Sequence, residues 1–120
     1  MEILHDKARI VQELVPGKQI TLAHIIANPD EILYQKLGLD TSIDYKSSAI
    51  GILTVSPAET AIICGDIAIK SSGAELGFVD RFSGTLILTG TVSAVEASFE
   101  AIATYVRDKL GFTVCNVTRT

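Results

Sequence analysis

Cysteine is scarce in this sequence, since only Cys64 and Cys115 occur among its 120 residues. The two stand far from each other, and neither shares a close spacing with a histidine. This arrangement lacks the ligand spacing of a zinc site and the pattern of a thioredoxin-type motif. We therefore predict no metal and no other cofactor. We expect both cysteines to be small buried side chains of a cytosolic protein.

An excess of basic residues is missing as well, because 10 Lys+Arg stand against 14 Asp+Glu, for a net charge of −4. Nucleic-acid-binding domains normally carry a basic stripe, so no nucleic-acid partner is expected. No apolar run approaches the roughly 18 residues of a membrane span. The first ten residues mix charges of both signs and lack the apolar stretch of a secretory signal. The sequence therefore predicts neither a membrane partner nor export.

Apolar side chains are abundant, at 48% of the chain, with a mean hydropathy of +0.38. A chain of this length forms one domain and buries about two-thirds of its unfolded surface. The apolar content is high for a small soluble monomer. It predicts that a subunit interface covers part of the surface.

Periodicity and turn residues predict nine elements in the order β-β-α-β-α-β-β-α-β. The predicted strands are 8–15, 19–27, 49–55, 74–79, 85–92 and 112–117, and the predicted helices are 28–38, 56–72 and 93–110; the polar segment 40–48 is a loop. Two strand–helix units have matching capping boxes, opened by Ser56 and Ser93. They predict a ferredoxin-like α+β core, with helices on one face of a mainly antiparallel sheet.

No set of residues has the spacing of a catalytic centre, so we predict that the protein is not an enzyme. His24 lies mid-strand among apolar neighbours, with no carboxylate or cysteine at ligand spacing, which favours a structural histidine. Capping explains Ser56 and Ser93, and no nucleophile motif surrounds either serine.

Three charged residues allow two interpretations each. Asp80 and Arg81 either form a surface ion pair at a strand junction or line a hole or pocket. Lys70, near the end of an apolar helix, either complements the helix C-terminus or reaches across to a partner. The residue pattern alone leaves both questions open.

Six short motifs run along the chain: VPGKQ at 15–19, TLAH at 21–24, AIGILT at 49–54, GDIA at 65–68, GFVDRFSG at 77–84 and CNVT at 115–118. In this order they resemble bacterial microcompartment shell proteins, the BMC-domain family. The resemblance extends over residues 9–120. More narrowly, the chain resembles the circularly permuted hexameric type, which includes the S-type subunit of ethanolamine-utilisation shells and the U-type subunit of propanediol-utilisation shells.

The resemblance implies a structural subunit with a circularly permuted ferredoxin-like fold. Such subunits form hexamers that tile, with other shell proteins, into the polyhedral shell around a metabolic enzyme core in the cytoplasm. We expect a single domain, with residues 1–18 as an N-terminal extension and residues 19–120 as the core. The implied partners are further copies of the chain, other shell proteins and the encapsulated enzymes. The encapsulated pathway stays open between ethanolamine, a diol and choline.

The resemblance also implies roles for particular residues. Arg81, Phe82, Ser83 and Gly84 match the pore loop that approaches the ring axis, and Lys70 matches the lysine at the edge where rings meet. A further segment matches a strand that forms a small parallel β-barrel over the pore; its residues are Arg9, Ile10, Val11, Gln12, Glu13 and Leu14. A lone strand has unpaired backbone groups, and closure into a barrel pairs them.

Two other functions are compatible with a small oligomeric domain of this fold class. A ferredoxin-like regulatory domain would bind a small ligand in a polar pocket at a subunit junction, but the sequence has no recognisable ligand motif. A small oligomeric enzyme would place its site between subunits, around Asp80 and Arg81. No paired acid and base supports that second alternative.

Overall fold

The computed structural model describes residues 17–39 and 48–120. Its strands are β1 (Gln19–Ile26), β2 (Ala49–Ser56), β3 (Glu75–Asp80), β4 (Thr85–Gly90), β5 (Thr113–Val114) and β6 (Thr118–Arg119). Its helices are α2 (Glu31–Lys36), α3 (Thr60–Ser71) and α4 (Val92–Leu110). The predicted strand at 8–15 and most of the predicted loop at 40–48 lie outside the described residues.

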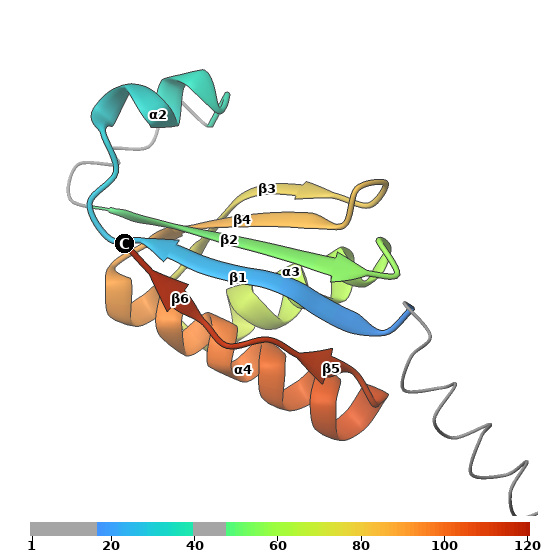
Figure 1. The fold of residues 1–120 in the computed structure, drawn as a ribbon. Helices are drawn as coiled ribbons and strands as arrows, with labels where there is room; N and C mark the ends of the chain where they lie inside the picture. The colour runs from blue at the N-terminus through green and yellow to red at the C-terminus, as the bar shows by residue number, and fades with distance from the viewer. Residues whose placement is uncertain (1–16, 40–47) are drawn as a thin grey trace, which may run out of the picture.

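One sheet contains all of these strands in the order β3-β4-β2-β1-β5, with β6 also paired to β1 (Figure 1). The pairs β1–β2, β2–β4 and β3–β4 are antiparallel, whereas β5 and β6 pair with β1 in parallel. The prediction of a mainly antiparallel sheet is confirmed. Without β1, the spatial order of the strands is β3-β4-β2-β5, which is that of a ferredoxin-like βαββαβ unit. Here β1 lies between β2 and β5.

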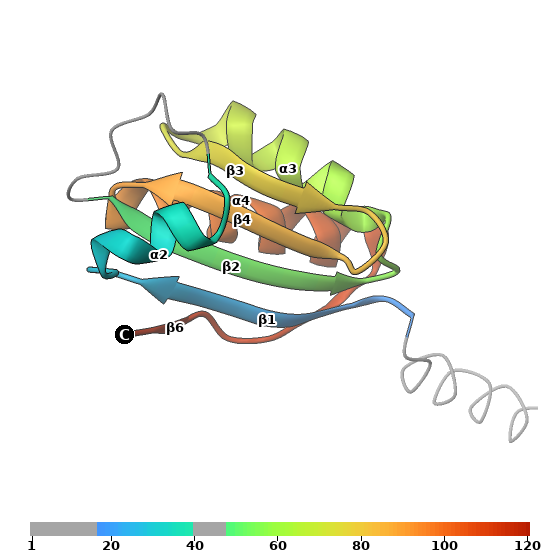
Figure 2. The ribbon, with the colours of Figure 1, turned by 90° about the horizontal axis from the view of Figure 1, so that it is seen from above.

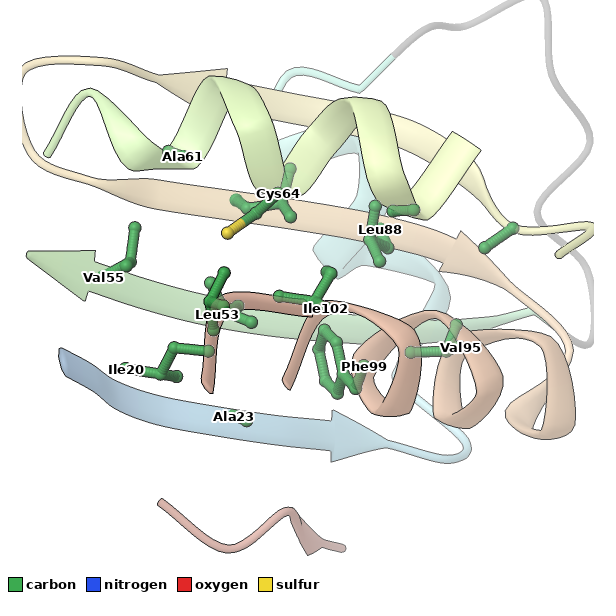
Figure 3. Packing of buried hydrophobic residues seen from close by; sticks show 14 of the residues in the cluster. Ile20, Ala23, Leu53, Val55, Ala61, Cys64, Leu88, Val95, Phe99 and Ile102 are labelled. Carbon is green, nitrogen blue, oxygen red and sulfur yellow. The ribbon is translucent and has the colours of Figure 1, made fainter. Parts of the chain in front are cut away.

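Successive side chains of β2 point to opposite faces of the sheet, so their contacts show which helices cover each face. Leu53 and Val55 belong to the main core cluster with residues of α3 and α4, as the close view in Figure 3 illustrates. Phe99 and Ile102 of α4 are fully buried in this cluster. The two long helices therefore cover one face of the sheet, on the far side in Figure 2.

The short helix α2 packs on the opposite face, near the start of β2 (Figure 2). Tyr34 and Leu39 form a second, smaller apolar cluster with Ile50 of β2 and Ile87 of β4. The Tyr34 hydroxyl donates a hydrogen bond to the carbonyl of Ser48. The prediction of helices on one face thus holds for α3 and α4, and α2 covers part of the other face.

Both predicted capping boxes are wrong. Ser56 remains in β2, paired with Gln19, so α3 begins only at Thr60 after a turn. The N-cap of α4 is Thr91, whose hydroxyl oxygen accepts a hydrogen bond from the Ala94 N–H at 3.1 Å. Thr91 has extended backbone angles, φ −65° and ψ 156°, and these allow its side chain to reach that N–H.

The C-terminal segment after α4 forms two short strands and not the single strand that was predicted. Helix α4 ends at Leu110, before Gly111, whose φ of 74° is a left-handed cap that glycine adopts without strain. The single strand expected at 112–117 is replaced by the two-residue strands β5 and β6. Each of these strands has only two residue pairs with β1, so the C-terminal edge of the sheet consists of two short strands with a gap between them.

Glycine sets the distance between α4 and the sheet at one position. A Cβ built on Gly51 of β2 would stand 2.4 Å from Val95 Cγ1 and 2.8 Å from Phe99 Cζ. Both contacts are far below van der Waals separation, and both partners are fully buried. The helix can lie this close to β2 because residue 51 has no side chain.

We predict that Gly51→Ala lowers the free energy of unfolding by about 1–3 kcal/mol, the usual cost of overpacking a dense core. Urea unfolding followed by circular dichroism, at equal protein concentration, measures the change. Gly73→Ala is the matched control, because a Cβ there has no atom within 4 Å. It should change the free energy by no more than about 0.5 kcal/mol. Equal unfolding midpoints for both variants would contradict this account of the packing.

Candidate functional site

The turn between β3 and β4 contains the predicted loop residues, and a single carboxylate organises it. Asp80 Oδ1 accepts a hydrogen bond from the Phe82 N–H at 2.8 Å, and Asp80 Oδ2 accepts one from the Ser83 hydroxyl at 2.8 Å. These bonds, that from the Phe82 N–H first, lower the pKa of the Asp80 carboxyl below its ordinary value. Asp80 is therefore ionised at neutral pH and restrains the turn.

Gly84 closes the turn against the neighbouring strand. Its φ is 77°, and its carbonyl oxygen accepts a hydrogen bond from the Val55 N–H at 2.9 Å. A Cβ on Gly84 would lie 2.2 Å from the Val55 carbonyl oxygen. The turn itself thus requires glycine, through a close approach within one chain.

Arg81 and Phe82 form the outer surface of this turn. Phe82 is 81% exposed, and the Arg81 guanidinium carbon lies 4.9 Å from the centroid of its ring, which is a cation–π contact. A shallow depression beside them is lined by Ile62 of α3, Val79, Asp80, Arg81 and Phe82. Within the described residues no ion pair joins Asp80 to Arg81, so the interpretation as a surface ion pair is wrong. Phe82 and Ile62, which both line this depression, are therefore exposed apolar side chains on one surface.

Lys70 lies in the last turn of α3, where its charge complements the helix C-terminus, which is one of the two interpretations left open by the sequence. Its Nζ is 2.9 Å from Asp66 Oδ2, one helical turn earlier, and both side chains are largely exposed. The i,i+4 spacing of an acid and a lysine is visible in the sequence, although Asp66 is not among the predicted partners of Lys70.

The turn and Lys70 lie toward opposite ends of α3. Ile62, in the first turn of the helix, borders the depression beside Phe82, whereas Lys70 follows eight residues later. At 1.5 Å per residue this separation is about 12 Å along the helix axis. The structure therefore does not bring the predicted site residues into one pocket. It presents two separate surfaces.

Large apolar side chains are exposed on several elements, as the composition predicts. Those of the described residues are Leu22, Ile32, Leu37, Ile62, Ile63, Ile69, Leu76, Phe78, Phe82, Tyr105 and Val117. Several of them lie on α3 and β3, which adjoin at one side of the sheet (Figure 2). Exposure on this scale favours burial between subunits.

His24 is a structural residue, as predicted. Its Nδ1 lies 2.6 Å from the Thr118 hydroxyl and its Nε2 lies 3.0 Å from the Thr120 hydroxyl, so both ring nitrogens hold the C-terminal residues against β1. Cys64 is buried, and burial raises the pKa of its thiol to about 11. Cys115 is only partly buried, which is less than predicted.

Neither a metal centre nor a membrane span is found in the described part of the chain. Over residues 17–39 and 48–120, no three side chains of His, Cys, Asp or Glu are grouped as metal ligands. None of the helices in these two ranges combines the length and the apolar character needed to cross a bilayer.

Comparison with solved structures identifies close relatives of this fold. One is a CutR flat hexamer, with a TM-score of 0.79 and 44% identity, covering 88% of this chain and 94% of that chain. The fused permuted hexameric shell protein MSM0275 from the RMM microcompartment is 22% identical, with a TM-score of 0.63. This match covers 73% of our chain and 46% of that one, and it shows a shared fold.

Sequence comparison gives a consistent result. The chain is 52% identical over 112 residues to the bacterial microcompartment shell protein PduU of Salmonella typhimurium strain LT2, covering 93% of both chains. It is 46% identical over 114 residues to the shell protein EutS of Escherichia coli strain K12, covering 95% of this chain and 98% of EutS. The BMC domain model matches residues 49–118, from β2 to the C-terminal strands. The chain therefore belongs to the BMC-domain family of bacterial microcompartment shell proteins.

Proposed function

We propose that this chain is a non-enzymatic structural subunit that forms homohexameric rings in the shell of a cytoplasmic microcompartment. The likeness to the chain of a flat hexamer, over 88% of our sequence, carries the proposal. The apolar side chains exposed on α3 and β3 support it, because a ring would bury part of that surface. The regulatory alternative has no support from the relatives, which are named as shell proteins.

We further propose a single, circularly permuted domain with an extension at 1–18 and a core at 19–120. The position of β1 supports this division. It precedes the region matched by the family model, yet it lies inside the sheet between β2 and β5. A strand that comes first in the sequence and lies within the sheet is what a permutation produces.

Within such a ring we propose that Arg81, Phe82, Ser83 and Gly84 approach the axis and that Lys70 lies at the outer edge. The turn is suited to an opening because Asp80 and Gly84 restrain it while Phe82 is exposed. The two surfaces lie toward opposite ends of α3, so one can face inward while the other faces outward.

The proposed pore-capping strand, which includes Arg9 to Leu14, lies outside the described residues and stays a prediction. The direction of the chain supports it. Gln19 pairs with Ser56, and the preceding residue Val55 bonds to Gly84 of the turn. The chain therefore enters β1 at the end of the sheet that carries the proposed pore loop, as the right side of Figure 1 shows.

The first prediction of the proposed function concerns assembly. Multi-angle light scattering at micromolar concentration should give a mass six times the 12.8 kDa of one chain. Negative-stain microscopy should then show rings, sheets or tubes. A stable monomer would contradict the proposal, and a smaller oligomer stabilised by a metabolite would favour the regulatory alternative.

The second prediction separates the edge of the ring from the ring itself. Lys70→Ala should leave the hexamer intact and impair side-by-side tiling, because within one chain its charge meets only the exposed Asp66 carboxylate, while we place its side chain at the edge between rings. Lys109→Ala is the control, since Lys109 is also a lysine in the last turn of a helix. Light scattering measures the rings and microscopy measures the sheets. If Lys70→Ala forms sheets as extensive as those of the parent, the edge role is wrong.

The third prediction concerns the segment before β1. Deletion of residues 1–14 should leave the hexamer intact and uncover an axial opening bordered by Arg81, Phe82 and Ser83. Cryo-electron microscopy of the full chain and the deleted chain measures the difference at the axis. An axis that is open already in the full chain would show that this segment does not obstruct the pore.

A further inference from the structure

The last residues of the chain, 116–120, are attached to the sheet without burying apolar surface. We call them the C-terminal tail. All of them are exposed, and none belongs to either apolar cluster of the described residues. A groove of about 570 Å³, lined by residues of α4 and by Asn116 and Val117, lies along one side of the tail. Segments with exposed hydrogen bonds and few buried apolar contacts open locally at low cost. The C-terminal tail can therefore leave the sheet while the core stays folded.

Backbone hydrogen bonds and one ion pair hold the C-terminal tail at the edge of β1 (Figure 1). The Thr120 N–H donates to the Ile25 carbonyl oxygen, and the Ala27 N–H donates to the Thr120 carbonyl oxygen, both at 2.9 Å. Arg119 forms an exposed ion pair with Glu96 of α4, at 3.3 Å. Backbone pairing at a strand edge gives affinity for an extended segment of almost any sequence, whereas side-chain contacts give specificity.

The side-chain contacts of the C-terminal tail with β1 centre on His24. The Nδ1 atom of His24 lies 2.6 Å from the Thr118 hydroxyl oxygen, and its Nε2 lies 3.0 Å from the Thr120 hydroxyl oxygen. Side chains two residues apart in a strand point to the same face, so one imidazole ring spans both hydroxyls. A neutral imidazole has one N–H donor and one acceptor nitrogen, and a hydroxyl can fill either role. The ring is therefore suited to a segment with hydroxyl side chains at alternate positions.

Two copies of the chain can exchange their tails and keep all of these contacts, because each copy provides one β1 edge and one tail. Exchange of an identical element is a low-cost way of linking protomers. Val114, which pairs with Ile20, keeps the start of the segment on its own chain. The six residues after Val114 span at most about 20 Å when extended, so the tail can reach the β1 edge of a second copy within that distance.

We propose that the β1 edge at His24 binds the C-terminal tail of a second copy, in place of the chain's own tail. The backbone of Ala23, Ile25 and Ala27 supplies the pairing, and the His24 ring selects segments of the pattern Thr-x-Thr. The exchange links two chains without any further contact surface between them. It depends neither on the proposed pore loop nor on the edge position proposed for Lys70.

Peptide binding tests the site. In a chain with Thr118→Val and Thr120→Val, the tail is weakened while His24 is retained. A fluorescent peptide with the sequence of residues 116–120, NVTRT, should bind this chain at least about tenfold more tightly than the parent chain, because the parent's own tail competes as an intramolecular ligand. The control peptide NVVRV keeps the arginine and the backbone but lacks both hydroxyls. It should bind the same chain about tenfold more weakly than NVTRT, since two hydrogen bonds are lost.

A second substitution assigns the selectivity to His24. His24→Leu, added to the same chain, removes both ring nitrogens, so NVTRT and NVVRV should then bind with equal affinity in fluorescence polarisation. Circular dichroism and light scattering establish that each variant keeps the fold and the assembly of the parent. A chain that lacks residues 118–120 repeats the measurement with no competing tail. Equal affinity of the two peptides for the chains that retain His24 would overturn the proposal.

Refolding two complementary chains together tests whether the occupant comes from a second copy. The first chain has an intact site, Thr118→Val with Thr120→Val in its tail, and a heavy-isotope label. The second chain has an intact tail and His24→Leu. Hydrogen exchange in the labelled peptide that contains Ala27, followed by mass spectrometry, should be at least about fivefold slower than when the second chain also has the two valines, because the intact tail then forms the stronger hydrogen bonds. Equal exchange in the two mixtures, with NVTRT still binding to the first chain, would overturn the tail of a second copy as the occupant.

Discussion

The whole sheet depends on the insertion of β1 between β2 and the C-terminal strands. β1 pairs with β2 along almost its full length, and it is also the strand to which β5 and β6 are bonded. The backbone of Thr120 forms hydrogen bonds with the backbones of Ile25 and Ala27. The ring nitrogens of His24 form hydrogen bonds with the hydroxyls of Thr118 and Thr120. These contacts join positions more than 90 residues apart. The native sheet is therefore complete only after both ends of the core have been brought together, which makes its topology strongly non-local.

The two features proposed to take part in assembly, the β3–β4 turn and helix α3, are both attached to this sheet. The β3–β4 turn extends from one end of it and is restrained by Asp80 and Gly84, so an exposed Phe82 does not require a loose loop. Helix α3 packs on one face of the sheet, with its buried side against the sheet and several apolar side chains exposed on its other side. The hydrogen-bonded turn and the helix thus expose apolar side chains that neighbouring subunits would cover.

Much of the fold could be predicted from the sequence, because its strands and α4 have clear periodicity and end at turn residues. The predicted bounds of β1, β2 and the end of α4 agree closely with the structure. Helix α4 begins one residue earlier than predicted because Thr91 caps it locally, whereas two other errors arose where tertiary contacts overrode local patterns. Ser56 has the spacing of a cap but stays in the ladder with Gln19, and the last strand is interrupted because β1 pairs with it in two short stretches. Of the candidate site, motif resemblance pointed to the turn and to Lys70, and their roles stay predictions. It did not identify Asp66, whose partner is defined by helix geometry, nor the restraint of the turn by Asp80.

The positions of the two ends of the core have a practical consequence for building with this protein. Thr120 is held beside Ile25, at the end of β1 that leads to α2, whereas Gly17 precedes the other end of that strand (Figure 1). A peptide joined directly before Gly17 and one joined after Thr120 would thus leave opposite ends of the sheet, the first on the side of the β3–β4 turn and the second on the side of α2. If the β3–β4 turn lies at the ring axis as proposed, six peptides joined before Gly17 would lie around that axis. Six peptides joined after Thr120 would leave from the opposite end of each sheet. The first position would then suit a peptide meant to obstruct the axis, and the second a peptide meant to be displayed.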